Sequence, residues 1–271
     1  MNRTECKFLV PNRYLDEIRR MVQPFVEQDP YAARTGGTYT VRSIYYDTPH
    51  LSYYREKLEG LKMRKKLRIR GYNESKPDDL IFLEIKRRFN TPISKNRSPV
   101  RFSDLPQLLA TGDTERYVQK LPSFKEAEAD AQRFLYNLGR HQLVPVVTTV
   151  YDREAFVGKF DKSLRVTFDK NLRSEARPTL DALTREGRQK YVFKGHFVLE
   201  IKYYGPIMPV WGRTLTGRFG LRQEAVSKYA YAVDTHGLGR FPFTAFQAAP
   251  STRLPRPSLL DARYASRFTR S

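Results

Sequence analysis

The chain has 271 residues, 40% of them apolar, so it is long enough and apolar enough to form a packed core. Its 49 Lys and Arg residues exceed its 29 Asp and Glu residues, and the net charge of +20 favours polyanionic partners such as nucleic acid, phosphate chains or anionic membranes. A single cysteine excludes an intrachain disulfide framework and a cysteine-rich zinc site. No stretch approaches the roughly 18 consecutive apolar residues of a membrane span, and the N-terminus lacks a signal segment, so we expect a cytoplasmic protein.

The N-terminal part of the chain alternates strand and helix patterns. Residues 3–10 alternate as a strand does and place Cys6 on the expected core face. Apolar residues at spacings of three and four predict an amphipathic helix over residues 14–26. Residues 38–46 predict a strand, after which Asp47 or Thr48 is the expected cap of a short helix over residues 50–58.

Charged residues alternate with apolar ones in several predicted strands. Residues 64–70 place Leu67 and Ile69 on one face and basic side chains on the other. Three further strands share a Glu-x-Lys spacing, and the two charges of each pair must point the same way. The charged positions are Lys66, Arg68 and Arg70, and the pairs are Glu5 with Lys7, Glu84 with Lys86, and Glu200 with Lys202.

The remaining segments predict one helical insertion between two groups of strands. Residues 90–99 are polar and contain prolines, which indicates a loop that presents Lys95 and Arg97. Residues 101–139 are mostly helical by periodicity, with the clearest helix over 126–138. Strands are predicted at 80–88, 144–156, 164–169 and 198–203, and a helix containing residues 227–229 comes near the end.

The charged strand faces have two interpretations. Each one alone is typical of the solvated face of an antiparallel sheet. Taken together, the faces are mostly Lys and Arg, with Arg153 and Arg165 on two further strands, and like charges placed opposite each other destabilise a sheet. We therefore expect these faces to converge on a polyanion, and phosphate is the ligand that Arg and Lys match best.

With these motifs, the chain resembles the triphosphate tunnel metalloenzymes (CYTH-like superfamily) and, within them, the polyphosphate polymerases with a VTC domain. The resemblance covers residues 3–233, and the number and order of its motifs make it specific. The motifs are Arg3-x-Glu5-x-Lys7, Ser43-Ile-Tyr-Tyr-Asp47, Leu67-Arg-Ile-Arg70, Leu83-Glu-Ile-Lys86, Ser94-Lys-Asn-Arg97, Tyr151-x-Arg153, Leu164-Arg-Val-Thr-Phe-Asp169, Leu199-Glu-Ile-Lys-Tyr203 and Ser227-Lys-Tyr229.

The resemblance implies an α+β fold: an antiparallel β tunnel or barrel with a basic interior, flanked by helices. We expect one such domain over residues 1–245. Residues 246–271 are rich in Pro, Ser and Arg and have no periodicity, which indicates a basic, disordered tail. The implied catalytic residues are Arg68, Arg70, Lys86, Arg153 and Arg165; the implied phosphate-binding residues are Lys7, Lys66, Lys95, Ser227 and Lys228; and Glu200 would hold the metal. Lys202, Arg97 and Asp169 are either ligands or structural ion-pair partners.

The implied reaction is transfer of the ATP γ-phosphate to a growing inorganic polyphosphate chain, with Mn²⁺ or Mg²⁺ as cofactor. The partners are then ATP and polyphosphate, and no specific nucleic acid is expected. Tunnel triphosphatases begin with Glu-x-Glu-x-Lys, whereas this chain has Arg3 at the first position, which favours polymerisation over hydrolysis. The alternatives are a triphosphatase or nucleotide cyclase of the same fold, and a non-catalytic module that binds polyphosphate or nucleic acid.

Overall fold

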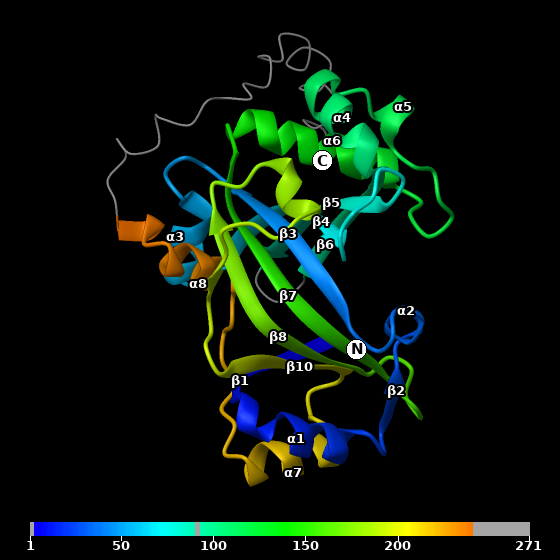
Figure 1. Cartoon of the computed structure of the whole chain (residues 1–271), viewed down its shortest axis with the longest axis vertical. Helices are drawn as coiled ribbons and strands as arrows, with labels where there is room; N and C mark the ends of the chain where they lie inside the picture. The colour runs from blue at the N-terminus through cyan, green and yellow to red at the C-terminus, as the bar shows by residue number, and fades with distance from the viewer. Residues whose placement is uncertain (1–2, 90–92, 241–271) are drawn as a thin grey trace. The chain divides into compact units, whose positions relative to one another are not determined.

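The computed structural model describes residues 3–89 and 93–240, which form two compact units (Figure 1). Of the described residues, unit 1 contains 3–43, 147–176 and 185–236, and unit 2 contains 44–89, 93–146, 177–184 and 237–240. Two strands, β3 (Tyr39–Asp47) and β7 (Val144–Gly158), have residues in both units. The predicted tail, residues 246–271, lies outside the described residues.

Unit 1 is built on an antiparallel sheet in which β10 and β8 lie between β1 and β7. The short strand β2 pairs with β7 and β9 pairs with β8. The strands are β1 (Arg3–Pro11), β2 (Val26–Gln28), β8 (Arg165–Ala176), β9 (Lys190–Tyr191) and β10 (His196–Tyr204). The predicted strands at 3–10, 164–169 and 198–203 are thus confirmed, although each extends beyond its predicted bounds.

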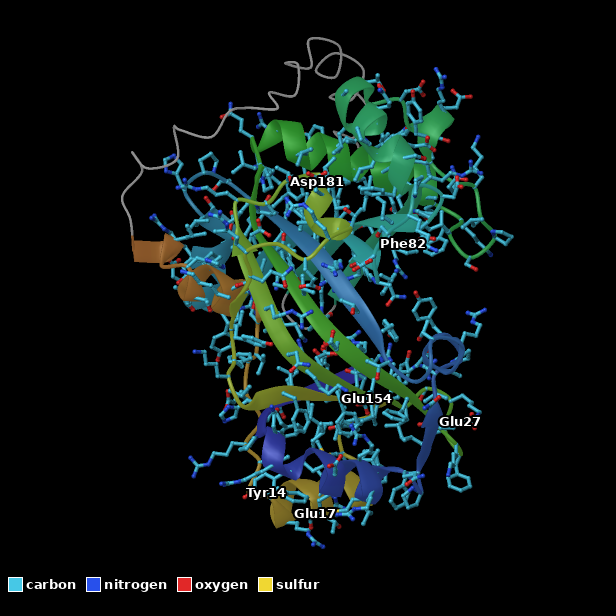
Figure 2. All side chains as sticks on the ribbon, in the orientation of Figure 1. Tyr14, Glu17, Glu27, Phe82, Glu154 and Asp181 are labelled. Carbon is cyan, nitrogen blue, oxygen red and sulfur yellow. The ribbon has the colours of Figure 1, made fainter. Side chains whose placement is uncertain are left out.

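Two helices of unit 1, one formed by residues 15–22 and the other by residues 210–218, pack on one face of its sheet. Cys6, Phe8 and Ile18 are buried there in one apolar core, as predicted for Cys6. Tyr14, labelled in Figure 2, packs its ring against Phe219 at 5.1 Å between centroids. The helices are α1 (Leu15–Val22), α2 (Pro30–Arg34), α7 (Val210–Arg218) and α8 (Lys228–Thr235), with the 3-10 turn η1 (Asn12–Tyr14). Helix α1 is shorter than predicted because the chain enters β2 at Val26.

Unit 2 contains the antiparallel strands β4 (Met63–Tyr72), β5 (Leu80–Phe89) and β6 (Ile93–Arg101). The prediction of a loop over residues 90–99 was wrong for its described part, since residues 93–99 belong to β6. Among the described strands, β6 has a neighbour on one side only, and such an edge strand tolerates Pro99 and polar side chains that a central strand excludes. Residues 90–92 lie outside the described residues.

In the described part of unit 2, four helices bury its core, in which Leu67, Ile69 and Phe134 are fully inaccessible. They are α3 (Ser52–Leu58), α4 (Leu105–Thr111), α5 (Thr114–Tyr117) and α6 (Ala127–Arg140), with the 3-10 turns η2 (Phe102–Asp104), η3 (Leu180–Leu183) and η4 (Leu238–Arg240). The helical insertion over 101–139 is confirmed, and α6 packs against β5 and β6. Asp47 accepts hydrogen bonds from the N–H groups of Tyr53 and Tyr54 at 2.9 Å each, so its side chain caps α3 as predicted, although the helix begins at Ser52 rather than residue 50 and its N-cap position is Leu51.

The fold is α+β with antiparallel pairing, as predicted, but the sheet is not closed, so the expected barrel does not form among the described strands. Strands β1 and β6 each have a single strand neighbour. Non-strand segments supply hydrogen bonds at both edges: Glu224 N–H donates to the Lys7 carbonyl at 2.9 Å, and Asp130 accepts from Arg97 N–H at 2.9 Å. None of the helices in residues 3–89 and 93–240 is both long enough and apolar enough to span a lipid bilayer.

Candidate functional site

The register of β4, β5 and β6 sets charged side chains in rows across unit 2. Written from β4 to β6, the rows are Lys66, Lys86 and Lys95; Arg68, Glu84 and Arg97; and Arg70, Phe82 and Pro99. Positions two residues apart on a strand share a face, so the three rows occupy one face, which we call the basic face. Its rows contain six cations and one carboxylate, and the sheet therefore concentrates positive charge there.

Glu84 is the centre of the basic face. Its side chain is 2% exposed, and its carboxylate lies 2.6 Å from Arg68, 2.9 Å from Lys95 and 3.1 Å from Arg97. Burial by itself would raise the pKa of Glu84, but these cations and Arg70 lower the pKa well below its ordinary value. The carboxylate is therefore ionised, and it holds cations from β4 and β6 in fixed positions.

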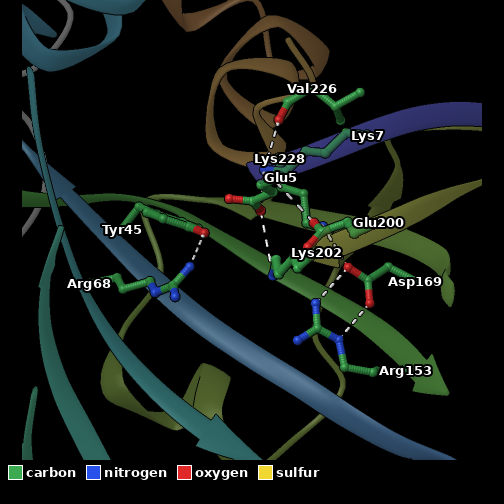
Figure 3. A network of polar contacts seen from close by, with 10 residues as sticks. All are labelled: Glu5, Lys7, Tyr45, Arg68, Arg153, Asp169, Glu200, Lys202, Val226 and Lys228. Atoms are coloured by element: carbon green, nitrogen blue, oxygen red, sulfur yellow. Dashed lines mark hydrogen bonds and ion pairs between the residues drawn. The ribbon is translucent and has the colours of Figure 1, made fainter. Parts of the chain in front are cut away.

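Tyr45 and Phe82 support two arginines of this face. The Tyr45 hydroxyl accepts a hydrogen bond from Arg68 Nη1 at 2.9 Å (Figure 3). Burial would raise the pKa of Tyr45, but the charges of Arg68, Lys66 and Arg70 lower it to about 7. The guanidinium of Arg97 lies 3.6 Å from the centroid of the Phe82 ring, which fixes its plane.

Unit 1 holds a second group of charges, the Glu200 cluster, drawn in Figure 3. Strand register places Glu5 opposite Lys202 and Lys7 opposite Glu200, so charges of opposite sign alternate across β1 and β10. Strands β7 and β8 add Arg153 and Asp169, and α8 adds Lys228. The members of the cluster are Glu5, Lys7, Arg153, Asp169, Glu200, Lys202 and Lys228.

Glu200 is surrounded by ammonium groups. Its side chain is 5% exposed, and its two oxygens lie 2.9 Å from Lys228 and 2.9 Å from Lys202, with Lys7 at 3.8 Å. Burial would raise the pKa of Glu200, whereas the lysines and Arg153 lower it well below its ordinary value. The carboxylate is thus anionic and is a hard oxygen donor.

Asp169 fixes the two most enclosed cations of the cluster. Arg153 donates to both of its oxygens at 2.6 and 2.7 Å, and Lys228 lies 2.6 Å from Oδ2. Burial would lower the pKa of Arg153 and of Lys228, but Asp169 raises both above their ordinary values. The Tyr151 ring lies 5.2 Å from the Arg153 guanidinium and 4.8 Å from the Lys228 ammonium group.

The predicted site residues are thus distributed over two groups. Lys7, Arg153, Lys228 and Glu200 are members of the Glu200 cluster, and Lys66, Arg68, Arg70, Lys86 and Lys95 lie on the basic face. Arg165 lies opposite Lys202, but its guanidinium donates to the Lys162 and Leu164 carbonyls rather than to a carboxylate of the cluster. The Ser227 side chain caps α8 by accepting from Ala230 N–H at 3.4 Å, which positions Lys228.

Sequence reasoning missed two roles. Glu84 was identified only through its spacing to Lys86, yet its partners are Arg68 and Arg97, which only strand register can reveal. Tyr45 was identified only as part of the Ser43–Asp47 motif, and its hydroxyl accepts a hydrogen bond from Arg68. Arg97, Lys202 and Asp169, for which the sequence left two roles open, all lie in ion pairs.

The described residues do not form a preformed metal site, since no three or more His, Cys, Asp or Glu side chains gather among them in a way that could hold a metal ion. Glu200 supplies one ionised carboxylate, whose oxygens already contact Lys202 and Lys228. Mg²⁺ in phosphate-transfer sites commonly takes one or two carboxylates and completes its shell with phosphate oxygens and water. The donor set fits a divalent ion only as part of a metal–phosphate complex.

The fold and the two charge groups define an α+β protein with cation-rich sheet faces. A family model described as the VTC domain matches residues 2–236, and the chain belongs to this family. It is 29% identical over 154 residues to vacuolar transporter chaperone complex subunit 2 of Saccharomyces cerevisiae. It is 27% identical over 158 residues to vacuolar transporter chaperone complex subunit 4 of Trypanosoma brucei brucei.

These matches are partial. Each covers 49% of this chain, and they cover only 18% and 19% of the two relatives. Among solved structures, the PH1819 protein from Pyrococcus horikoshii OT3 is similar at a TM-score of 0.42 and 14% identity, over 86% of this chain and 99% of that one.

Proposed function

We propose that the chain is a polyphosphate polymerase that transfers the γ-phosphate of ATP to a growing inorganic polyphosphate chain. The observation that supports this most strongly is the basic face, where six cations share three strand rows with the single carboxylate of Glu84. Membership of the VTC domain family and the vacuolar transporter chaperone subunits among the relatives agree with the proposal.

The chemistry of the basic face suits a chain of phosphates better than it suits a neutral ligand. Guanidinium forks pair with two phosphate oxygens at once, and ammonium groups act as point charges beside them. Arg68 and Arg97 are already oriented by Glu84, so binding a phosphate costs little side-chain entropy. A linear polyanion would also offset the mutual repulsion of Lys66, Lys86 and Lys95, which lie next to one another across the strands.

In the proposed reaction a terminal oxygen of the polyphosphate chain attacks the γ-phosphorus of ATP. The bond from that phosphorus to the β–γ bridging oxygen breaks, ADP leaves, and the chain is longer by one phosphate. Such a transfer needs alignment and neutralisation of charge more than covalent chemistry. We assign Arg68, Arg70, Lys86, Arg153 and Arg165 to charge neutralisation, and Lys7, Lys66, Lys95, Ser227 and Lys228 to phosphate binding.

We propose that Glu200 holds Mn²⁺ or Mg²⁺ together with phosphate oxygens. The metal would neutralise charge on the phosphates and favour their in-line arrangement. Lys228 and Lys202 keep Glu200 ionised, which a hard divalent cation requires of its ligand.

Incubation with ATP and Mn²⁺ or Mg²⁺ tests the proposal, with gel electrophoresis to detect long-chain polyphosphate. We expect chains that lengthen with time and ADP as the second product. Free phosphate without chains would identify a triphosphatase, and a cyclic nucleotide would identify a nucleotide cyclase. Unchanged ATP would indicate a non-catalytic binding module. Each of these three results would contradict the polymerase.

The variant Glu200→Ala separates the polymerase from a binding module. We expect turnover to fall by about 100-fold or more while polyphosphate still binds, since the cations remain. Arg68→Ala should weaken polyphosphate binding itself, and Glu115→Ala, at an exposed carboxylate on α5, is the control that should leave both measurements unchanged. Full turnover in Glu200→Ala would remove Glu200 from the metal role.

A further inference from the structure

We infer that Asp130, on helix α6, is a positioning residue for Lys95 and Arg97 of the basic face and acts on them through the backbone of β6. The inference rests on the proposed function, because it assumes that the basic face binds phosphate. Asp130 itself is on no strand and contributes no side chain to that face.

Side chains of β6 alternate between two faces of the strand, so the residues of the basic face and the residue that contacts α6 point in opposite directions. Lys95 and Arg97 point to the basic face, where both contact Glu84. Asn96, between them, points the other way. It is 8% exposed, and its Nδ2 donates to Asp130 Oδ1 at 2.7 Å.

The second oxygen of Asp130 binds the backbone of the same strand. Arg97 N–H donates to Asp130 Oδ2 at 2.9 Å. On the outer side of an edge strand, no neighbouring strand accepts hydrogen bonds from the backbone N–H groups. Here the Asp130 carboxylate accepts one of these hydrogen bonds. One side chain therefore holds two consecutive residues of β6, Asn96 by its amide and Arg97 by its main chain.

Asp130 is itself fixed, which is what a positioning residue requires. Its side chain is 12% exposed, and Arg133 donates to its Oδ1 at 2.7 Å from the next turn of α6. Ala127, Ala131 and Phe134 of α6 are buried in the unit 2 core. The Asp130 carboxylate thus connects a helix that is packed in the unit 2 core to a strand with few apolar side chains.

Strand β6 needs this connection because its own sequence favours a loop. Asn96 and Pro99 have low strand propensity, and the strand has one strand neighbour. Without Asp130, the part of β6 that presents Lys95 and Arg97 would open more often. Both cations would then lose their fixed places around Glu84, and phosphate binding would weaken.

The variant Asp130→Asn in the full chain tests the inference. Asparagine has one accepting oxygen, which favours the Asn96 and Arg133 donors and turns its NH₂ group towards Arg97 N–H. Two measurements are made: hydrogen exchange of the β6 amides, and calorimetric binding of inorganic tripolyphosphate. We expect exchange at Arg97 to be at least about tenfold faster and tripolyphosphate to bind about tenfold more weakly, with exchange in β1 unchanged. Asn96→Ala, which removes one of the two contacts, should have an intermediate effect.

Glu126→Gln is the matched control. Like Asp130, Glu126 accepts a hydrogen bond from Arg133, at 3.1 Å. Its side chain is 71% exposed, and among the described residues none of its hydrogen bonds reaches β6. It should leave exchange and binding unchanged. Unchanged exchange in Asp130→Asn, or faster exchange with unchanged tripolyphosphate affinity, would overturn the inference. If the wild-type chain does not bind tripolyphosphate, the proposed function fails, while the exchange comparison still decides whether Asp130 orders β6.

Discussion

Tyr45 shows how strongly the basic face affects a single residue. The side chain is buried, and a phenol in an apolar environment would have a raised pKa, but three neighbouring cations lower the pKa of Tyr45 from 10.0 to about 7. Near neutral pH the Tyr45 hydroxyl therefore changes from a neutral acceptor of the Arg68 hydrogen bond to a phenolate, which would reduce the net positive charge available to phosphate.

The variant Tyr45→Phe should remove this titration. The folded protein lowers the pKa, so the phenolate stabilises the fold fully above pH 10, and this contribution disappears as the pH falls through about 7. Between these values we expect the free energy of unfolding of the wild type to rise relative to Tyr45→Phe by about 1 kcal/mol per pH unit. Denaturant unfolding across this range measures the difference, and phenolate absorbance reports the titration directly. Parallel stability curves would contradict the lowered pKa.

At the scale of elements, caps and edges decide where helices and strands begin. Asp47 ends β3 and is fully buried, and it accepts hydrogen bonds from Thr48, Tyr53 and Tyr54 N–H groups at the start of α3. The sequence indicated this cap, because an acidic or hydroxyl residue before a proline is typical of a helix start. The carboxylate joins β3 to α3 within unit 2.

We expect Asp47→Ala to lower the free energy of unfolding by about 2–4 kcal/mol, since it leaves buried N–H groups without an acceptor. Asp29→Ala is the comparison, because Asp29 caps α2 through a single N–H, that of Tyr31, at 2.9 Å. That variant should cost only about 1 kcal/mol. Denaturant unfolding of both variants measures the costs, and equal losses would contradict the role of Asp47 as a multiple acceptor.

For the molecule as a whole, the dominant physical property is its net charge of +20. The cations of the basic face and of the Glu200 cluster are partly offset by carboxylates, so the field available to a polyanion depends on screening by salt. Long polyanions that contact many cations respond to salt more steeply than short ones.

We expect the affinity for long-chain polyphosphate to fall by about tenfold or more between roughly 50 and 500 mM salt, and the affinity for tripolyphosphate to fall less. Calorimetric titration at several salt concentrations measures both slopes. Arg68→Ala should reduce the slope for the long chain, whereas Lys120→Ala, at a lysine outside both charge groups, should not. Equal slopes for the two ligands would contradict extended binding along a basic surface.

The sequence by itself determined which residues share a strand face, because alternation at a period of two is a local property. It thereby identified Lys66, Arg68 and Arg70 as one set, and the three Glu-x-Lys pairs as others. Helix α6 and the cap at Asp47 followed from equally local patterns. The family also followed from the sequence, because the order of the motifs is independent of their positions in space.

Only the tertiary structure decided which of these residues meet. Register brought Arg97 of β6 and Arg68 of β4 to the carboxylate of Glu84, and it set Glu200 among lysines from three elements. It also made a strand of a segment whose composition favours a loop, because β5 on one side and Asp130 on the other supply its hydrogen bonds. Pairing partners come from distant parts of the chain, so no local pattern could have specified them.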